Sequence, residues 1–322
     1  YMELQNYLTE QKELLDHFHQ FIQEENDSEE DFLNLISYIK TKKYDENLEE
    51  FKLILYIIND ISNNHHRYPS FFDKIEKIIT YFSETIKQDF PNYELFNIFQ
   101  NNKKILYLLF QNKIILVDSN IANLILNKCN IFTKYQINYF NSDKISFNKY
   151  FEHKIKNTKN YDYYFFPDIK PFVFKGNLTH IEKYLLQQSE NSFQKFEYNR
   201  KIGENDSYIC ILIRQDSIKE FIIYVNKNNL SLSSEVPDSI FETNPFLMKK
   251  PATLIQYAAF FGSIQIFKYL QLNQVKLEPS LWLYAIHSNN PEIIQILVEN
   301  KIKPNDQSYL ECFLESIKCH HN

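Results

Sequence analysis

Apolar side chains recur at steps of three and four residues through the first hundred positions of the chain. Such spacing places them along one face of an α-helix. The residues Asp27 to Glu30 offer N-cap and first-turn chemistry for one helix, and Pro69 and Pro91 mark the starts of two others. The pattern predicts helices over residues 4–22, 32–39, 51–58, 71–86 and 93–99. Residues 1–90 are therefore predicted to form a helical N-terminal domain.

Beyond residue 90 one pattern recurs: a helix, a tight turn and a second helix. It is clearest over residues 257–270, with Gly262 at the turn, and over 284–297, where Asn289 takes the same place. Gly and Asn are the residues that best tolerate a positive φ. The same frame fits residues 97–109, and weaker copies lie around Gly176, Asp216 and His320. The pattern predicts an array of helical hairpins.

The few alanines of the chain support this register. Three of them, Ala258, Ala259 and Ala285, fall at the positions of the frame where paired helices approach closely. Thr253-Leu254-Ile255-Gln256-Tyr257-Ala258-Ala259 then resembles the T-P-L-H-x-A-A signature of the ankyrin repeat, with Gly262 and Ser263 at its G-H turn. The sequence departs from that signature where Leu254 replaces the proline, and its repeat spacing varies. We expect Thr253 to cap its helix and Gln256 to replace the histidine as a hydrogen-bonding residue.

The whole chain resembles the ankyrin-repeat family that is expanded in parasitic protists. Residues 61–67, 204–210 and 253–263 carry this resemblance. It implies an all-α fold in which a helical N-terminal domain stacks on an irregular ankyrin-like solenoid over residues 91–322, clearest over 251–307. It also implies a binding role without enzymatic activity or cofactor.

Composition and charge narrow the class of protein. The chain has 322 residues, 44% hydrophobic and 24% charged, which is typical of a globular protein. Its three glycines are too few for a turn-rich β fold or a phosphate-cradling loop. The net charge of −6 argues against nucleic acid as a partner, and the acidic excess lies within residues 1–60. We expect the acidic part to be a solvated helical face, with a docking surface as the alternative.

Cysteine usage and hydropathy bear on location. Four widely separated cysteines without a C-x-x-C pair disfavour a disulfide framework and fit a reducing compartment. No stretch approaches 18 consecutive apolar residues, so membrane insertion is not expected. The first fifteen residues contain acids where a signal peptide needs bases. These features together predict a cytoplasmic protein.

Three clusters invite a chemical interpretation. Adjacent His65 and His66 rarely ligate one ion, because neighbouring helical side chains point about 100° apart; we expect them in a helix-terminal turn exposed to solvent. Cys312, Cys319, His320 and His321 have spacings unlike those of zinc sites, so no metal site is predicted. Lysines within residues 144–159 precede the aromatic run 161–167, which we expect to be a buried connector and not a nucleic-acid surface.

The favoured function is a protein-interaction module, an adaptor or scaffold, that binds other proteins. Partners are expected on exposed first-helix positions of the concave face: Gln256, Phe260, Leu283 and His287. The alternatives are a structural component of a larger permanent assembly and an enzyme with an unrecognised site. The frame makes residues 308–318 a first helix without its second helix, so we expect the natural chain to continue or another chain to cover that helix.

Overall fold

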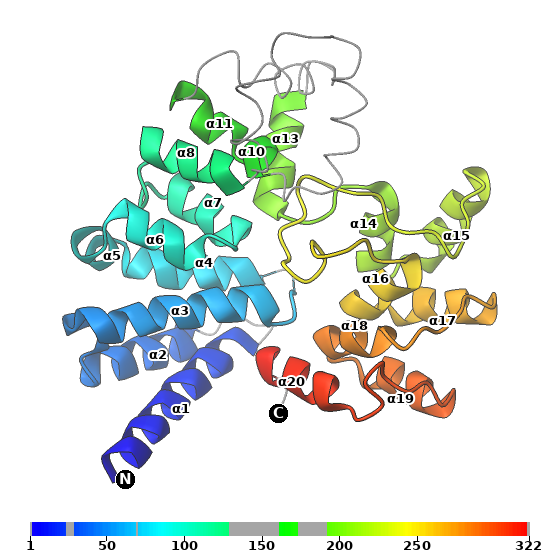
Figure 1. Ribbon diagram of the computed structural model, residues 1–322, viewed down its shortest axis with the longest axis horizontal. Coiled ribbons are helices and arrows are strands. Elements are labelled where there is room, and N and C mark those ends of the chain that lie inside the picture. Colours follow the sequence, from blue (N-terminus) through cyan, green and yellow to red (C-terminus); the bar gives the residue numbers. More distant parts are fainter. Residues whose placement is uncertain (1, 24–28, 69, 129–160, 173–191, 321–322) are drawn as a thin grey trace, which may run out of the picture.

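The computed structural model describes residues 2–23, 29–68, 70–128, 161–172 and 192–320 (Figure 1). Every regular element among them is a helix, and the β-type pairing in this part of the chain is a single bridge between Glu235 and Thr253. The predicted all-α class is therefore confirmed. Two groups of helices lie side by side, which we name the first lobe (α1–α13) and the repeat lobe (α14–α20).

The first lobe contains the helices predicted from apolar spacing. Asn47 caps α3 by accepting hydrogen bonds from the amides of Glu49 and Glu50. The predicted helix over residues 71–86 is interrupted at Phe82, where one helix ends and the next begins. The helices are α1 Met2–Gln23, α2 Glu29–Thr41, α3 Leu48–Asn64, α4 Phe71–Tyr81, α5 Ser83–Asp89, α6 Asn92–Phe99, α7 Lys103–Gln111, α8 Ser119–Lys128, α10 Tyr161–Tyr164, α11 Phe166–Ile169 and α13 Ser192–Ile202.

The repeat lobe consists of three helical hairpins followed by one helix. Its inner row is α14 Tyr208–Arg214, α16 Leu254–Phe261, α18 Leu281–Ser288 and α20 Leu310–Lys318; its outer row is α15 Ile218–Lys227, α17 Ile264–Leu272 and α19 Pro291–Glu299. Each inner helix is followed by a residue with positive φ: Asp216, Gly262, Asn289 and His320. The hairpin frame and its turn residues are thus confirmed in the repeat lobe. The copy over residues 97–109 corresponds to α6 and α7, but no residue of the turn between them has a positive φ, and the copy around Gly176 lies outside the described residues.

Local details of the second hairpin, α16 and α17, also match the prediction. Thr253 caps α16 through its hydroxyl, and the Gln256 side chain accepts a 2.9 Å hydrogen bond from the Thr253 amide, which completes a capping box. Ala258, Ala259 and Ala285 are fully buried where α16 packs against α18. Small side chains are needed here because the two inner-row backbones approach closely.

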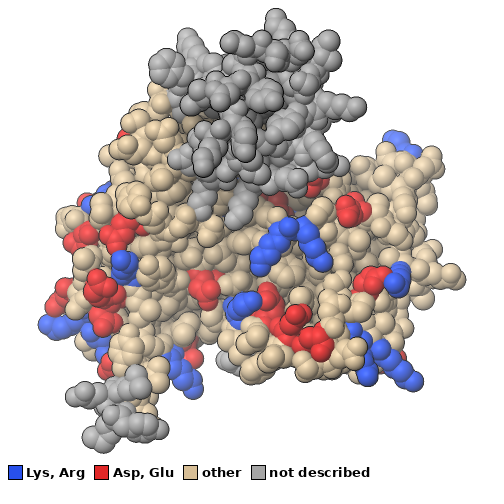
Figure 2. All heavy atoms as spheres, viewed as in Figure 1, with Lys and Arg blue, Asp and Glu red and all other residues tan. Residues whose placement is uncertain are grey.

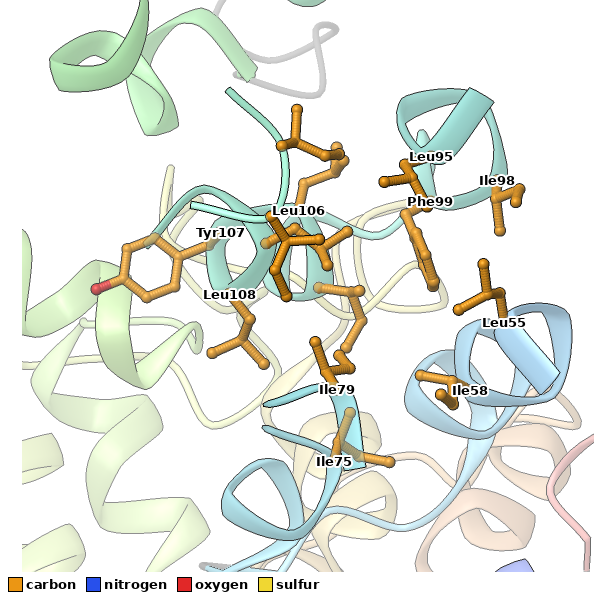
Figure 3. Close-up of a cluster of buried hydrophobic side chains, with 14 of the residues drawn as sticks. Leu55, Ile58, Ile75, Ile79, Leu95, Ile98, Phe99, Leu106, Tyr107 and Leu108 are labelled. Carbon is orange, nitrogen blue, oxygen red and sulfur yellow. The ribbon is translucent and has the colours of Figure 1, made fainter. Parts of the chain in front are cut away.

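Two hydrophobic cores divide the chain differently from the predicted boundary at residue 90. Helices α6 to α13 share the core of α1 to α5, and the second core begins at Ile209. Figure 3 shows the reason: Leu55 of α3, Ile79 of α4, Phe99 of α6 and Leu106 of α7 project toward one interior space. The first lobe therefore extends to residue 202, well past the predicted N-terminal domain.

One segment of the repeat lobe ties the two lobes together. We name Ile240–Asn244 the tie segment; Ile240 and Phe241 belong to the first core, although the chain around them belongs to the repeats. Lys103 of α7 donates to the Ile240 and Glu242 carbonyls, and Arg67 donates a 3.1 Å hydrogen bond to the Thr243 hydroxyl. These buried contacts fix how the lobes sit against each other.

Candidate functional site

The last described helix, α20, presents an uncovered apolar face. Its residues Leu310, Phe313, Leu314 and Ile317 follow steps of three and four, so they lie on one side of the helix. Between 49% and 61% of each side chain is exposed. The inner helices α14, α16 and α18 are each covered by an outer helix, and none of the described helices covers α20 in this way. We name these four side chains the open face.

The opposite side of α20 is anchored on α18 by a chain of polar contacts. His287 Nε2 lies 2.9 Å from a Glu315 carboxylate oxygen, and His287 Nδ1 lies 3.4 Å from Cys319 Sγ. An imidazole that carries its proton on Nε2 satisfies both contacts, because it donates to Glu315 and accepts from the thiol. The hydrogen bond from His287 lowers the pKa of Glu315 to about 2, against the effect of burial and with help from Lys318.

The end of α20 meets the first lobe in a group of histidines. His320 Nε2 lies 3.3 Å from an Asp60 carboxylate oxygen, and its ring is 4.5 Å from that of His19 on α1. Burial, followed by the neighbouring His320, lowers the pKa of His19 to about 4. Burial also lowers the pKa of His66, against the opposing effect of the His287 backbone. We name His19, His65, His66, His287 and His320 the junction; they are five of the nine histidines in the chain.

The residues predicted to bind a partner do not form an exposed surface. Gln256, Phe260 and His287 are buried, and Leu283 is half-buried. The prediction that they are exposed is wrong for the first three. Gln256 is held by hydrogen bonds with Thr253 and Ser280, whereas Phe260 and His287 lie against the loop at residues 231–250. Phe246 of this loop packs on Phe260, on Tyr284 and on His287, with ring centroids 4.3 to 5.8 Å apart.

The other clusters named in the sequence analysis have different outcomes in the structure. His65 follows the end of α3 as predicted, yet it is buried at the junction instead of facing solvent. The aromatic run is buried as predicted over Tyr161 and residues 163–166, while the lysines of residues 144–159 lie outside the described residues. Cys312 is buried, on the same side of α20 as Cys319, but it does not join the group formed by His287, Glu315 and Cys319. The sequence missed this group because its members come from two helices.

A cysteine, a histidine and a carboxylate in hydrogen-bonding order also resemble the arrangement of a cysteine nucleophile with its base and orienting acid. Two observations oppose that interpretation. The Cys319 side chain has no exposed surface, so a substrate cannot reach it without movement of α20. Burial also raises the pKa of the thiol, which disfavours the reactive thiolate. The group is therefore a poor nucleophilic site as it stands.

Charge is distributed without one dominant surface. Figure 2 shows acidic and basic side chains interspersed over the described part of one face of the molecule. Several of them pair, for example Lys42 with Glu10 and Lys77 with Glu29 in the acidic N-terminal region. Exposed pairs of this kind contribute little to stability. This face offers no continuous basic patch for a polyanion.

In comparisons with known proteins, no family model, no curated protein and no solved structure matches the chain. Within the described ranges, no helix combines the length and the apolar character that crossing a bilayer requires.

Proposed function

We propose that the chain is a non-catalytic protein-interaction module, an adaptor or scaffold of ankyrin type, and that it binds through the open face of α20. The exposure of Leu310, Phe313, Leu314 and Ile317 on one short helix is the observation that carries this proposal. Contiguous apolar side chains at the surface are typical of a place where another protein binds. This replaces the concave face, where Gln256, Phe260 and His287 are buried.

The array itself suggests what kind of element fits there. In each preceding hairpin an outer helix covers the inner one; α19, for example, buries Ile293, Ile296 and Leu297 in the core of the repeat lobe. A partner segment that forms an amphipathic helix with this spacing would continue the outer row beside α20. We therefore propose an amphipathic helix of another protein as the ligand.

The size of the open face bears on the lifetime of the complex. Fully burying a large apolar side chain contributes about 1.5–3 kcal/mol, and each of the four is already about half-buried. Covering them contributes roughly 3–6 kcal/mol in total, before the cost of association is subtracted. Such a surface supports reversible binding, which fits an adaptor better than a component of a permanent assembly. The free thiols of Cys210, Cys312 and Cys319 fit the proposed reducing cytoplasm.

Site-specific photo-crosslinking tests this proposal. A benzophenone amino acid at Phe313 should crosslink a defined partner in cells, and Leu314→Glu should abolish the crosslink. The same probe at Leu272, which is 81% exposed on α17, serves as the matched control. Equal crosslinking from both positions, or partners reached only from residues 1–60, would contradict the proposal. Copurification of a partner in fixed stoichiometry would favour the permanent-assembly alternative.

A further inference from the structure

We propose that His287, Glu315 and Cys319 form a zinc site that joins α20 to α18. Each residue offers one donor atom, and the three donor atoms lie within 4.8 Å of one another. His287 is 2% exposed and Cys319 is fully buried, whereas the Glu315 side chain is 12% exposed. Nothing in this inference depends on the proposed protein-interaction function.

The helices place the donors for a common ion. Glu315 lies on α20, and Cys319, four residues later, directly follows the helix, so the two side chains share one face, as zinc ligands one turn apart commonly do. His287 approaches that face from the last turn of α18. The site is thus assembled across the contact between the two inner-row helices.

The distances are close to those of a tetrahedral centre. Zinc–sulfur and zinc–nitrogen bonds of about 2.3 and 2.0 Å hold a thiolate and an imidazole nitrogen roughly 3.5 Å apart. Cys319 Sγ and His287 Nδ1 are 3.4 Å apart. The ion therefore fits between them in place of the thiol proton. The carboxylate of Glu315 must turn from His287 Nε2 to reach the ion, a movement of about 1–2 Å for a donor set of this size.

The three donor atoms favour zinc over calcium or magnesium. Nitrogen, sulfur and oxygen donors together suit this borderline-soft cation better than calcium or magnesium, which prefer oxygen alone. Binding replaces the S–H bond of Cys319 with a zinc–sulfur bond, and the proton leaves to solvent. Three protein donors leave the fourth position to a water molecule. The ion enters on the side of Glu315, whose other carboxylate oxygen lies 3.0 Å from the ammonium of Lys318.

Metal titration of the full chain tests the site. After treatment with a chelator, the protein should bind one equivalent of Co²⁺ and develop the near-ultraviolet absorption of a cobalt–thiolate bond; Zn²⁺ should displace the cobalt. Fluorescence of Trp282, the single tryptophan, should respond because its ring lies 5.2 Å from Tyr309 just before α20. Zinc should also raise the melting temperature of the chelated protein.

Variants separate this site from adventitious binding. Cys319→Ser should weaken zinc binding by more than about 100-fold and remove the thiolate absorption. Cys312→Ser, on the same helix but outside the group, should change neither. Glu315→Gln keeps a hydrogen-bond acceptor for His287 and should still reduce affinity, which distinguishes ligation from loss of folding. Absence of stoichiometric metal binding, or equal effects of the two cysteine variants, would overturn the proposal.

Discussion

The two lobes are both built of helices, but they hold those helices together by different means. The repeat lobe uses one local device repeatedly: an inner helix, a residue with positive φ and an outer helix. The first lobe buries charged side chains from distant parts of the sequence, such as Arg200, which pairs with Asp168 and Glu197. Its folding therefore depends on contacts that no single hairpin contains. Local substitutions should weaken the repeat lobe by small steps, whereas loss of one buried charge should affect the whole first lobe.

The largest effect is expected from Arg200→Ala. The guanidinium is 1% exposed, and its removal leaves the carboxylate of Asp168 partly buried without its partner. Breaking a buried ion pair on one side costs about 3–5 kcal/mol. Chemical denaturation should show the loss, and Lys195→Ala, at an exposed position of α13, should leave the midpoint unchanged. An unchanged midpoint for Arg200→Ala would remove the distinction drawn between the lobes.

Ala259→Leu tests the close approach of the inner-row helices. Extra carbon atoms at this fully buried position should overpack the contact of α16 with α18 and cost about 1–3 kcal/mol. Gln265→Leu, at an exposed position of α17, is the control for adding a leucine to the same hairpin. Thermal unfolding of the two variants measures the difference. Equal melting temperatures would show that the repeat register is wrong.

Acid should loosen the junction between the lobes. The pKa of His19 is about 4 in the fold against 6.5 in a free side chain, because the ring is buried near His320 and His65, with Asp16 opposing the shift. The unfolded chain therefore binds a proton first, and stability present above pH 6.5 is lost as the pH falls toward 4. The ring is partly solvated, so we expect a loss of about 1–2 kcal/mol. Denaturation with chelator present should measure it, and His19→Gln should flatten the profile; an equally steep profile in that variant would contradict the assignment.

The smallest effect concerns the turns of the repeat lobe. Gly262 has a φ of 71°, which a residue with a side chain adopts at a cost. Gly262→Ala should therefore reduce stability by about 1–2 kcal/mol through backbone strain alone, because the added methyl group would make only ordinary contacts. Asn289 has a φ of 50° at the equivalent turn, so Asn289→Gly should change stability by less than about 1 kcal/mol. The melting temperature of Gly262→Ala should therefore be lower than that of Asn289→Gly. The reverse ranking would mean that the turns are not equivalent.

The sequence predicted what local chemistry determines. The turn positions Asp216, Gly262 and Asn289, and the helix cap at Thr253, depend on residues within a few positions of each other. Burial of Phe260 and His287 could not be foreseen in the same way, because the position of Phe246 and its loop depends on contacts far along the chain. The division between the cores likewise follows from packing of α3, α4, α6 and α7 on one another.

For the candidate sites, too, the sequence predicts local features but not contacts between distant residues. The apolar spacing of Leu310, Phe313, Leu314 and Ile317 could be read from the sequence, and the structure leaves them uncovered. The contact of His287 with Glu315 and Cys319 joins positions 28 and 32 residues apart, so motif spacing alone misses it. Spacing rules search for ligands within one turn or loop, whereas this group forms only when two helices of neighbouring repeats pack.

The tie segment has a consequence for how the protein is made. Ile240 and Phe241 complete a core whose other members all precede residue 197. During translation, most of the first lobe therefore emerges from the ribosome before Ile240 and Phe241, which complete its core, have been synthesised. When these two side chains emerge from the ribosome, α14 and α15 have already emerged, so the last step in building the first lobe coincides with the start of the repeat array. The two lobes are consecutive in sequence but must mature together.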